Sequence, residues 1–292
     1  MPARFLAAVA AVFSLLLLPA AADAAKPSYY VSLGDSYAAG YQRFSATEAR
    51  TTREGFAYQL VGQARKRGYR FKLVNFGCGG ETTTSILTRT SPCADLGPGG
   101  FNYAGRTQAV AAERFLRRNR GRVGLVTVSI GGNDVTACAQ AADPVACVGP
   151  AMERVKANGR KLLRGLRRAA GPKVRIVGIT YPDVLLGGWV SGAQSDRDLA
   201  GLSVVAFRNI LNPALKELYE SVHGRFVDVT RATKAYVPFE QTTTLAPYGQ
   251  LPVAVAEVCR LTAYCAFRDI HPNATGYRVI ARLIAATLPK RH

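Results

Sequence analysis

The segment YYVSLGDSYAAGY, residues 29–41, holds the features that decide the fold and raise the question of function. Its first part is apolar and β-branched, which is typical of a buried strand. The run stops at Gly34, and a carboxylate and a hydroxyl, Asp35 and Ser36, follow at once. These residue types are common in surface turns. The alternative interpretation is a nucleophilic serine at the edge of a sheet, and the segment alone does not decide between them.

Five short apolar runs along the chain are typical of strands: 29–33, 71–76, 123–130, 174–180 and 225–230. Helical periodicity lies between and after them, at 55–67, 105–119, 151–169, 197–222 and 274–288. Alternating strands and helices predict an α/β fold with a parallel sheet. Because the strands are apolar almost throughout, we expect helices to cover both faces of the sheet.

Two long stretches show neither pattern. They cover residues 181–196 and 231–269, and each follows a predicted strand. Irregular segments of this length usually serve a function. Ligands of open α/β sheets bind beside the carboxyl ends of the strands, so we expect these two segments to shape a binding pocket.

Residues 1–24 are interpreted as a signal peptide. Arg4 precedes an apolar run, residues 5–18, and an A-x-A arrangement ends at Ala24, as at signal cleavage sites. A membrane anchor is the alternative, but the run is shorter than the roughly 20 residues that a spanning helix needs. We expect bacterial-type export and a secreted or envelope-associated, soluble catalytic domain over residues 25–292.

Six cysteines follow the predicted cleavage site. An even number of cysteines in an exported chain indicates disulfides. Because the cysteines cluster in neighbouring pairs, we hypothesise three local disulfides: Cys78–Cys93, Cys138–Cys147 and Cys259–Cys265. Zinc ligation is the competing interpretation. It is weaker, because no C-x-x-C or paired histidine spacing accompanies the cysteines.

The formal net charge is +19. Basic residues gather at 117–122 and 160–168, and such patches can bind nucleic acid. We expect no nucleic-acid partner, because the chain contains no recognisable nucleic-acid module and export removes the usual partner. The interpretation that remains is attraction to an anionic envelope or membrane surface.

Polar clusters follow four of the predicted strands. Ser36 follows the first, NFGCGGETT (75–83) ends the second, IGGND (130–134) ends the third, and DIHPN (269–273) lies beyond the fifth. A serine, glycine-rich backbone, an asparagine and His271 therefore converge at one edge of the sheet. Acyl transfer needs such a set, because serine requires a base and the oxyanion requires fixed N–H donors. The other histidines, at a predicted helix end and at the terminus, fit less well.

These four segments, in this order, resemble the blocks of the SGNH hydrolases, also called GDSL lipases and esterases. The resemblance of GDSY (34–37) to the first block implies that Ser36 is the nucleophile. The second and third blocks imply that the Gly80 amide and the Asn133 side chain form an oxyanion hole with the Ser36 amide. The last block implies that His271 is the base.

The resemblance covers essentially the whole mature chain. The six cysteines and the segment GFAYQL (55–60) are also similar to secreted actinobacterial lipases of this family. The family implies a flavodoxin-like three-layer α/β/α fold with a five-stranded parallel sheet. We expect a monomer, and we expect no cofactor or metal, since neither a metal cluster nor a phosphate-binding loop is visible in the sequence.

The last block departs from the family pattern. The usual aspartate stands three residues before the histidine, where this chain has Arg268, whereas Asp269 is only two residues before His271. Two alternatives remain open: Asp269 orients the imidazole as the third catalytic residue, or a backbone carbonyl does so. Asp35 and Asp134 are expected to hold turns, and Trp189 either floors an acyl pocket or packs within its loop.

The substrate is expected to be an ester, either of an acyl lipid or of an acylated glycan. A lipase or esterase is the first hypothesis, and a carbohydrate acetylesterase is its nearest rival. A non-catalytic binding protein on the same scaffold is a rival of another class.

Overall fold

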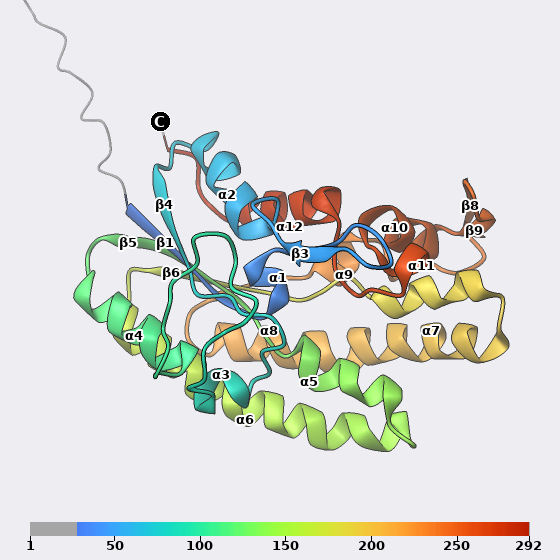
Figure 1. The fold of residues 1–292 in the computed structure, drawn as a ribbon, viewed down its shortest axis with the longest axis horizontal. Coiled ribbons are helices and arrows are strands. Elements are labelled where there is room, and N and C mark those ends of the chain that lie inside the picture. Colours follow the sequence, from blue (N-terminus) through green and yellow to red (C-terminus); the bar gives the residue numbers. More distant parts are fainter. Residues whose placement is uncertain (1–27, 292) are drawn as a thin grey trace, which may run out of the picture.

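The structure is a computed structural model that describes residues 28–291. The expected signal peptide, residues 1–24, lies outside this range. Five parallel strands form the central sheet in the order β4-β1-β5-β6-β7 (Figure 1). They are β1 (Ser28–Gly34), β4 (Phe71–Asn75), β5 (Val123–Ser129), β6 (Arg175–Ile179) and β7 (Arg225–Val227). Counted among these five strands alone, the order is 2-1-3-4-5, as in flavodoxin-like folds.

Helices cover both faces of the sheet, which confirms the predicted three-layer α/β/α architecture (Figure 1). One apolar cluster joins the sheet to α4 (Gln108–Arg118), α6 (Pro144–Ala170) and α8 (Asn212–Glu220). A second cluster joins it to α2 (Phe56–Arg65) and α12 (Ala274–Ala286). In β1, Val31 belongs to the first cluster and Tyr30 to the second, because successive side chains of a strand point to opposite faces.

The predicted helix over 197–222 is three elements rather than one. The structure has α7 (Gln194–Ala206), a π-helical turn η3 (Phe207–Leu211) and α8. Pro213 follows η3 and stands in the first turn of α8. Because proline has no backbone N–H to donate, a regular helix cannot continue through this position with all its bonds intact.

The prediction that 181–196 and 231–269 are irregular is wrong. The first stretch contains the 3₁₀ helix η2 (Val184–Ser191). The second contains β8 (Thr242–Leu245) paired with β9 (Gly249–Pro252), and then α10 (Val253–Leu261) and α11 (Tyr264–Phe267); α9 (Val229–Ala232) straddles its start. A third apolar cluster, which includes Leu186, Ala200 and Val255, joins η2, α7 and α10. These elements are too short to show a clear period in the sequence.

Further short elements that the sequence analysis does not predict lie near the carboxyl edge of the sheet. They are α1 (Ser36–Ala39), the antiparallel pair β2 (Tyr41–Arg43) and β3 (Ala49–Thr51), α3 (Ser85–Thr88), α5 (Gly132–Thr136) and the 3₁₀ helix η1 (Ala137–Gln140).

The structure contains three disulfides, Cys78–Cys93, Cys138–Cys147 and Cys259–Cys265, the pairs that the local clustering predicts. Over residues 28–291, no helix has the length and apolar character needed to cross a membrane.

Candidate active site

Ser36 is held at the carboxyl end of β1 by the turn that begins at Gly34. Gly34 has φ +132°, and a Cβ there would lie 1.9 Å from the carbonyl oxygen of Ser129. Only glycine fits this conformation and this close approach. The Asp35 side chain then caps α1 by accepting a hydrogen bond from the Tyr37 backbone N–H at 3.0 Å. Ser36 is therefore the first residue of a short helix that starts where the strand ends.

His271 meets Ser36 from the far end of the chain. Its Nε2 lies 2.8 Å from the Ser36 Oγ. The Asp269 Oδ1 lies 2.6 Å from the His271 Nδ1 and also accepts the His271 backbone N–H at 3.0 Å. An ionised carboxylate only accepts hydrogen bonds, so Nδ1 carries the hydrogen and the Nε2 lone pair faces the serine hydroxyl.

These two hydrogen bonds to the Asp269 Oδ1 explain why the aspartate stands two residues before His271. One carboxylate oxygen takes both the backbone and the ring N–H of a residue two positions later, as in an Asx turn. Arg268, which occupies the family's usual aspartate position, ends α11 in the left-handed conformation and pairs with Asp196 at 2.8 Å. The carbonyl of Ile270 accepts the Tyr37 hydroxyl at 2.7 Å.

Arg43, a residue that the sequence analysis does not single out, completes this arrangement. Its Nε donates to the Asp269 Oδ2 at 2.7 Å from strand β2. Burial opposes ionisation of Asp269, but hydrogen bonds from His271 and Arg43 outweigh it and hold the pKa of that carboxyl well below its usual range. The Tyr41 ring, with its centroid 4.5 Å from that of His271, packs against the imidazole.

The glycine-rich segment 75–83, which we call the glycine loop, is hydrogen-bonded to Asn133 at the same edge of the sheet. The Asn133 Nδ2 donates to the Glu81 carbonyl at 2.8 Å, and a side-chain amide carries a second hydrogen for another acceptor. Gly80 has φ +72°, and a Cβ there would meet nothing within 4 Å, so the space beside this glycine is open. Asp134 accepts the backbone N–H of Thr83 at 2.8 Å and its hydroxyl at 2.6 Å. Asp134 therefore holds the glycine loop in place.

Asp35 joins the ends of three strands. Besides capping α1, it accepts the Ser129 hydroxyl at 3.1 Å and the Tyr181 hydroxyl at 2.6 Å. Burial raises the pKa of Asp35 to about 6, against the opposing effect of these hydrogen bonds. The expectation that Asp35 holds a turn agrees with these contacts.

The family is settled by a family model described as the GDSL-like lipase/acylhydrolase family, which matches residues 32–279. The chain belongs to this family. This GDSL hydrolase is accordingly a carboxylic ester hydrolase. A comparison with curated proteins found no significant match.

Several solved structures resemble this GDSL hydrolase, all distantly. An extracellular lipase from Streptomyces rimosus is 18% identical with a TM-score of 0.49, over 89% of this chain and 100% of that one. An acetylxylan esterase from Geobacillus stearothermophilus is 16% identical with a TM-score of 0.48, over 89% and 93% of the two chains. An aryl esterase from M. smegmatis is 14% identical with a TM-score of 0.44, over 89% and 97%.

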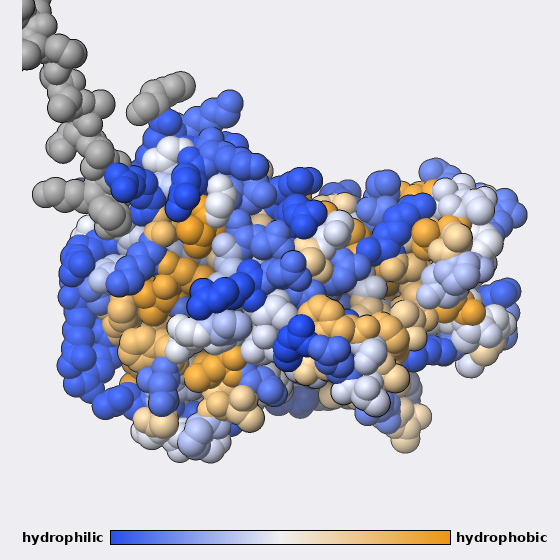
Figure 2. Space-filling view, turned by 45° about the horizontal axis from the view of Figure 1, so that its top comes forward, coloured by the Kyte–Doolittle hydropathy of each residue, from blue (hydrophilic) through white to orange (hydrophobic). Residues whose placement is uncertain are grey.

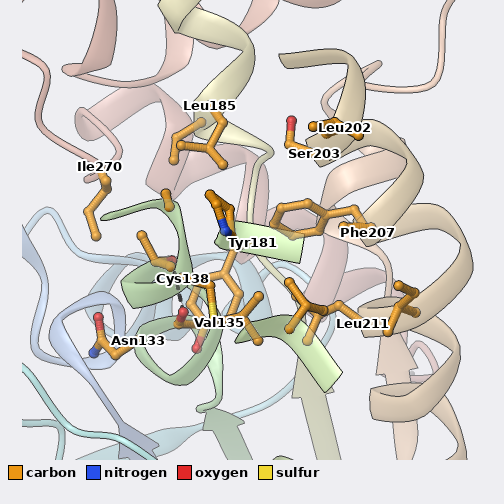
Figure 3. A pocket seen from close by; sticks show the side chains of 18 of the residues that line it. Asn133, Val135, Cys138, Tyr181, Leu185, Leu202, Ser203, Phe207, Leu211 and Ile270 are labelled. Carbon is orange, nitrogen blue, oxygen red and sulfur yellow. Dashed lines mark hydrogen bonds between the residues drawn. The ribbon is translucent and has the colours of Figure 1, made fainter. Parts of the chain in front are cut away.

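An apolar cavity of about 300 Å³ opens beside Ser36 in this GDSL hydrolase. Asn133 and Ile270 lie at one side of it, and Leu202, Phe207 and Leu211 lie across from them (Figure 3). Its walls come from α5, η1, the start of α6, η2, α7 and η3.

Of the two segments expected to shape a binding pocket, 181–196 supplies Tyr181, Pro182, Val184 and Leu185 to this lining, whereas 231–269 supplies none. The elements α6, α7 and η3 supply many of the other lining residues, and their apolar pattern in the sequence does not distinguish a cavity wall from a core-facing helix.

Trp189 lies outside the cavity lining. Its ring packs 4.8 Å from that of Phe239, and the Arg197 guanidinium lies 5.4 Å from its centre. Of the two interpretations of Trp189, packing within its own region is therefore correct.

Among residues 28–291, no three His, Cys, Asp or Glu side chains gather so that they could hold a metal ion.

Proposed function

We propose that this chain is an exported serine hydrolase that cleaves esters of apolar acyl chains through an acyl-enzyme. The observation that carries the proposal is the 2.8 Å contact between the Ser36 Oγ and the His271 Nε2 beside an apolar cavity. Serine becomes nucleophilic when an adjacent base takes its proton, and the cavity offers a place for the acyl chain next to that serine.

In the proposed reaction, the Ser36 Oγ bonds to the ester carbonyl carbon as its proton passes to the His271 Nε2. The Ser36 and Gly80 amides and the Asn133 side chain donate to the resulting oxyanion. When this tetrahedral intermediate collapses, the carbon–oxygen bond to the alcohol breaks, and the alcohol leaves with the proton from His271. Water then attacks the acyl-enzyme, and His271 takes the proton from that water and returns it to Ser36.

Asp269 is the proposed third member of a catalytic triad. Its hydrogen bond to Nδ1, at 2.6 Å, would keep the imidazole in the tautomer that accepts from Ser36 and would stabilise the imidazolium formed during attack. The alternative in which a backbone carbonyl orients His271 receives no support from the recorded contacts of the imidazole.

The substrate follows from the cavity. Its lining is dominated by Val, Leu, Ile, Met, Phe, Pro and Ala side chains, and it has the size of a small-molecule site. Each methylene that enters it contributes up to about 0.8 kcal/mol, or about a fourfold gain in kcat/KM. An acetyl group would leave most of this surface unused, so we favour an acyl lipid over an acetylated glycan as the substrate.

Export is part of the proposal. Residues 1–24 have the pattern of a signal peptide, and all six cysteines are paired in disulfides. Disulfides persist in oxidising compartments and are rare in reducing ones, so the three bonds support passage out of the cytoplasm.

The test of this function compares Ser36→Ala and His271→Ala with the parent enzyme on water-soluble acyl esters of increasing chain length. We expect both variants to lose ester hydrolysis, and only the Ser36→Ala variant to lose covalent labelling by a fluorophosphonate entirely. The parent should hydrolyse longer acyl esters faster than acetyl esters. Ser195→Ala, an exposed serine on α7, is the matched control and should behave as the parent.

Two results would contradict the proposal. Normal turnover in a folded Ser36→Ala variant would remove the serine mechanism. A parent enzyme that hydrolyses acetyl esters best, and loses rate steadily as the acyl chain grows, would assign the cavity another use and favour the carbohydrate acetylesterase.

A further inference from the structure

We propose that the mouth of the apolar cavity docks on the surface of an anionic lipid aggregate, with α6 and α7 lying against that surface. This inference rests on the proposed function, because it concerns how an acyl chain would reach Ser36 from lipid. We call the docking surface the mouth patch and define it by four side chains that line the cavity and are also exposed: Val145, Leu202, Val205 and Ile210.

The mouth patch holds an unusual share of the exposed apolar surface. Val145 is 68% exposed, Leu202 52% and Val205 53%. Over residues 28–291 the structure has eight exposed large apolar side chains, and four of them form this patch. The others lie on α4, on α11 and in two loops, and the Arg50 guanidinium lies over the ring of one of them, Phe44, at 4.4 Å. A concentration of exposed apolar side chains around a cavity indicates a binding surface.

Three of the four side chains of the mouth patch lie on two segments that contain no charge, and the fourth, Ile210, lies two residues beyond Arg208. Residues 144–152 open α6 and residues 199–207 run from α7 into η3, and neither contains Asp, Glu, Lys or Arg. Charged residues make up 20% of the chain, so two facing uncharged segments at one opening are a local departure. An uncharged surface of this kind can enter the boundary between headgroups and acyl chains, where a charged surface would stay in water.

The lipid should be anionic because α6 turns basic where the mouth patch ends. Beyond residue 152 this helix carries one acidic and seven basic residues, and five of the basic ones are exposed: Arg154, Arg160, Lys161, Arg164 and Arg168. Figure 2 shows one face of the molecule, with hydrophilic residues along its left edge and apolar areas on both sides of its centre. Basic residues beside an apolar patch attract anionic headgroups within a Debye length.

A lipid surface also suits the position of the catalytic residues. The cavity runs from the mouth patch to Ser36 and Asn133, and its lining offers an acyl chain continuous apolar contact between these two ends. A chain leaving a lipid surface at the mouth would therefore reach the serine without crossing water.

The test uses the Ser36→Ala variant of the full chain, so that vesicles are not hydrolysed, and measures co-sedimentation with vesicles of phosphatidylglycerol or of phosphatidylcholine. We expect binding to phosphatidylglycerol that weakens with salt, and much weaker binding to phosphatidylcholine. Adding Val145→Asp and Val205→Asp together should lower the partition coefficient about tenfold or more, because two inserted apolar side chains become charged. The matched control is Val110→Asp, an exposed valine on α4 that should change the partition coefficient little.

The charge contribution is tested separately with Arg160→Glu and Arg164→Glu. These substitutions should weaken binding to phosphatidylglycerol and reduce its salt dependence. When the two arginine substitutions are made in the active enzyme, which keeps Ser36, hydrolysis of a water-soluble ester should be unchanged. Both residues lie beyond the part of α6 that lines the cavity. That assay reports the proposed function without vesicles, so a failure of docking and a failure of catalysis are distinguished. Thermal melting confirms that each variant is folded.

Three outcomes would overturn the inference. The first is no binding to phosphatidylglycerol by a folded Ser36→Ala protein. The second is binding that the Val145→Asp and Val205→Asp pair leaves unchanged, which would reduce the interaction to electrostatic adhesion by the basic helix. The third is a dimer in size-exclusion chromatography that the same pair dissociates, which would assign the patch to a second copy of the chain.

Discussion

At the scale of single residues, the question with the clearest answer is what orients His271. Among residues 28–291, one carboxylate lies at hydrogen-bond distance from its Nδ1, that of Asp269 at 2.6 Å. We expect Asp269→Asn to lower turnover by about 10⁴, as the same change does in Ser-His-Asp proteases, because an amide at this place favours the wrong tautomer of the imidazole. Steady-state kinetics on a water-soluble ester measures this. A loss of less than tenfold in a folded variant would replace the triad with a Ser36–His271 dyad.

Arg43 is a positioning residue that acts on His271 through Asp269. Against the effect of burial, the hydrogen bonds from His271 and then from Arg43 hold the pKa of Asp269 low, so the carboxylate stays ionised as the pH falls. In Arg43→Gln that pKa rises towards its usual range. We expect kcat to fall about tenfold at neutral pH, the value of one charge-assisted hydrogen bond, and to fall further below that of the parent as the pH is lowered.

The pH profile separates this role from a purely structural one. A structural defect would lower kcat by the same factor at every pH, whereas loss of the Arg43 charge makes the factor grow towards acid. Arg43→Lys keeps the charge and should recover part of the loss. Arg50→Gln, on the neighbouring strand β3, is the matched control and should retain the profile of the parent.

Single residues also show where sequence reasoning ends. Ser36, Asn133 and His271 could be placed at one edge of the sheet because each follows a strand, and parallel strands end at the same edge. Arg43 could not, since it lies on a short strand pair outside the sheet and meets Asp269 across 226 residues of sequence. Nothing in the local pattern around Arg43 marks that contact.

At the scale of elements, the regular sheet and the irregular-looking segments differ in how far they could be predicted. Each sheet strand is a continuous apolar run, and the structure places all five within three residues of the expected bounds. The stretches 181–196 and 231–269 contain short helices and a hairpin, whose apolar contacts are with each other in a separate cluster. Such contacts leave no period in the sequence, so the pattern of both stretches predicts loops.

The disulfide Cys138–Cys147 gives an element-scale prediction about the cavity. It links η1 to the first turn of α6, and both elements line the cavity. Replacing both cysteines with serine should lower the free energy of unfolding by about 2–3 kcal/mol, the value expected for a short loop. It should also lower kcat/KM for long acyl esters more than for acetyl esters, because the wall that contacts the distal part of the chain loses its cross-link.

A matched variant replaces Cys259 and Cys265, which close a loop of similar length outside the cavity lining. It should lose comparable stability, measured by urea denaturation, and retain the parent's ratio of long-chain to acetyl hydrolysis. If the two double variants changed this ratio equally, the Cys138–Cys147 bond would have no specific role in acyl selection.

At the scale of the whole molecule, the catalytic edge and the cavity have different origins. The edge follows from the topology of the sheet, which brings residues 34–37, 75–83, 130–134 and 269–273 together in the order that the family pattern implies. The cavity follows from how α6 and α7 pack beyond the sheet. For that reason the reaction could be predicted from the sequence, whereas the shape of the acyl pocket could not.

The stability of the whole molecule should depend on pH through a carboxyl buried beside the cavity wall. Asp183 is fully buried and accepts the Ser203 hydroxyl at 2.9 Å through Oδ2, while its Oδ1 has no hydrogen-bond partner among the described residues. Burial raises the pKa of Asp183 from 3.8 to about 7, against the opposing effects of the Ser203 hydroxyl and of the nearby backbone N–H groups of Leu185 and Leu186. Between these values the folded protein keeps a proton that the unfolded chain releases. The free energy of unfolding therefore falls as the pH rises from about 4 to about 7.

Asp183→Asn removes this titration while keeping the size of the side chain. We expect the parent to lose stability relative to this variant between pH 5 and pH 8, by an amount on the order of 3 kcal/mol. Asp35 is also buried with a raised pKa, but it is present in both proteins, so its contribution cancels in the difference. Asp198→Asn, which changes an exposed carboxyl of α7, is the control and should give a difference that is nearly independent of pH. Urea denaturation at both pH values measures the effect, and a parent that gains stability relative to Asp183→Asn as the pH rises would show that Asp183 is ionised in the folded protein well below pH 7.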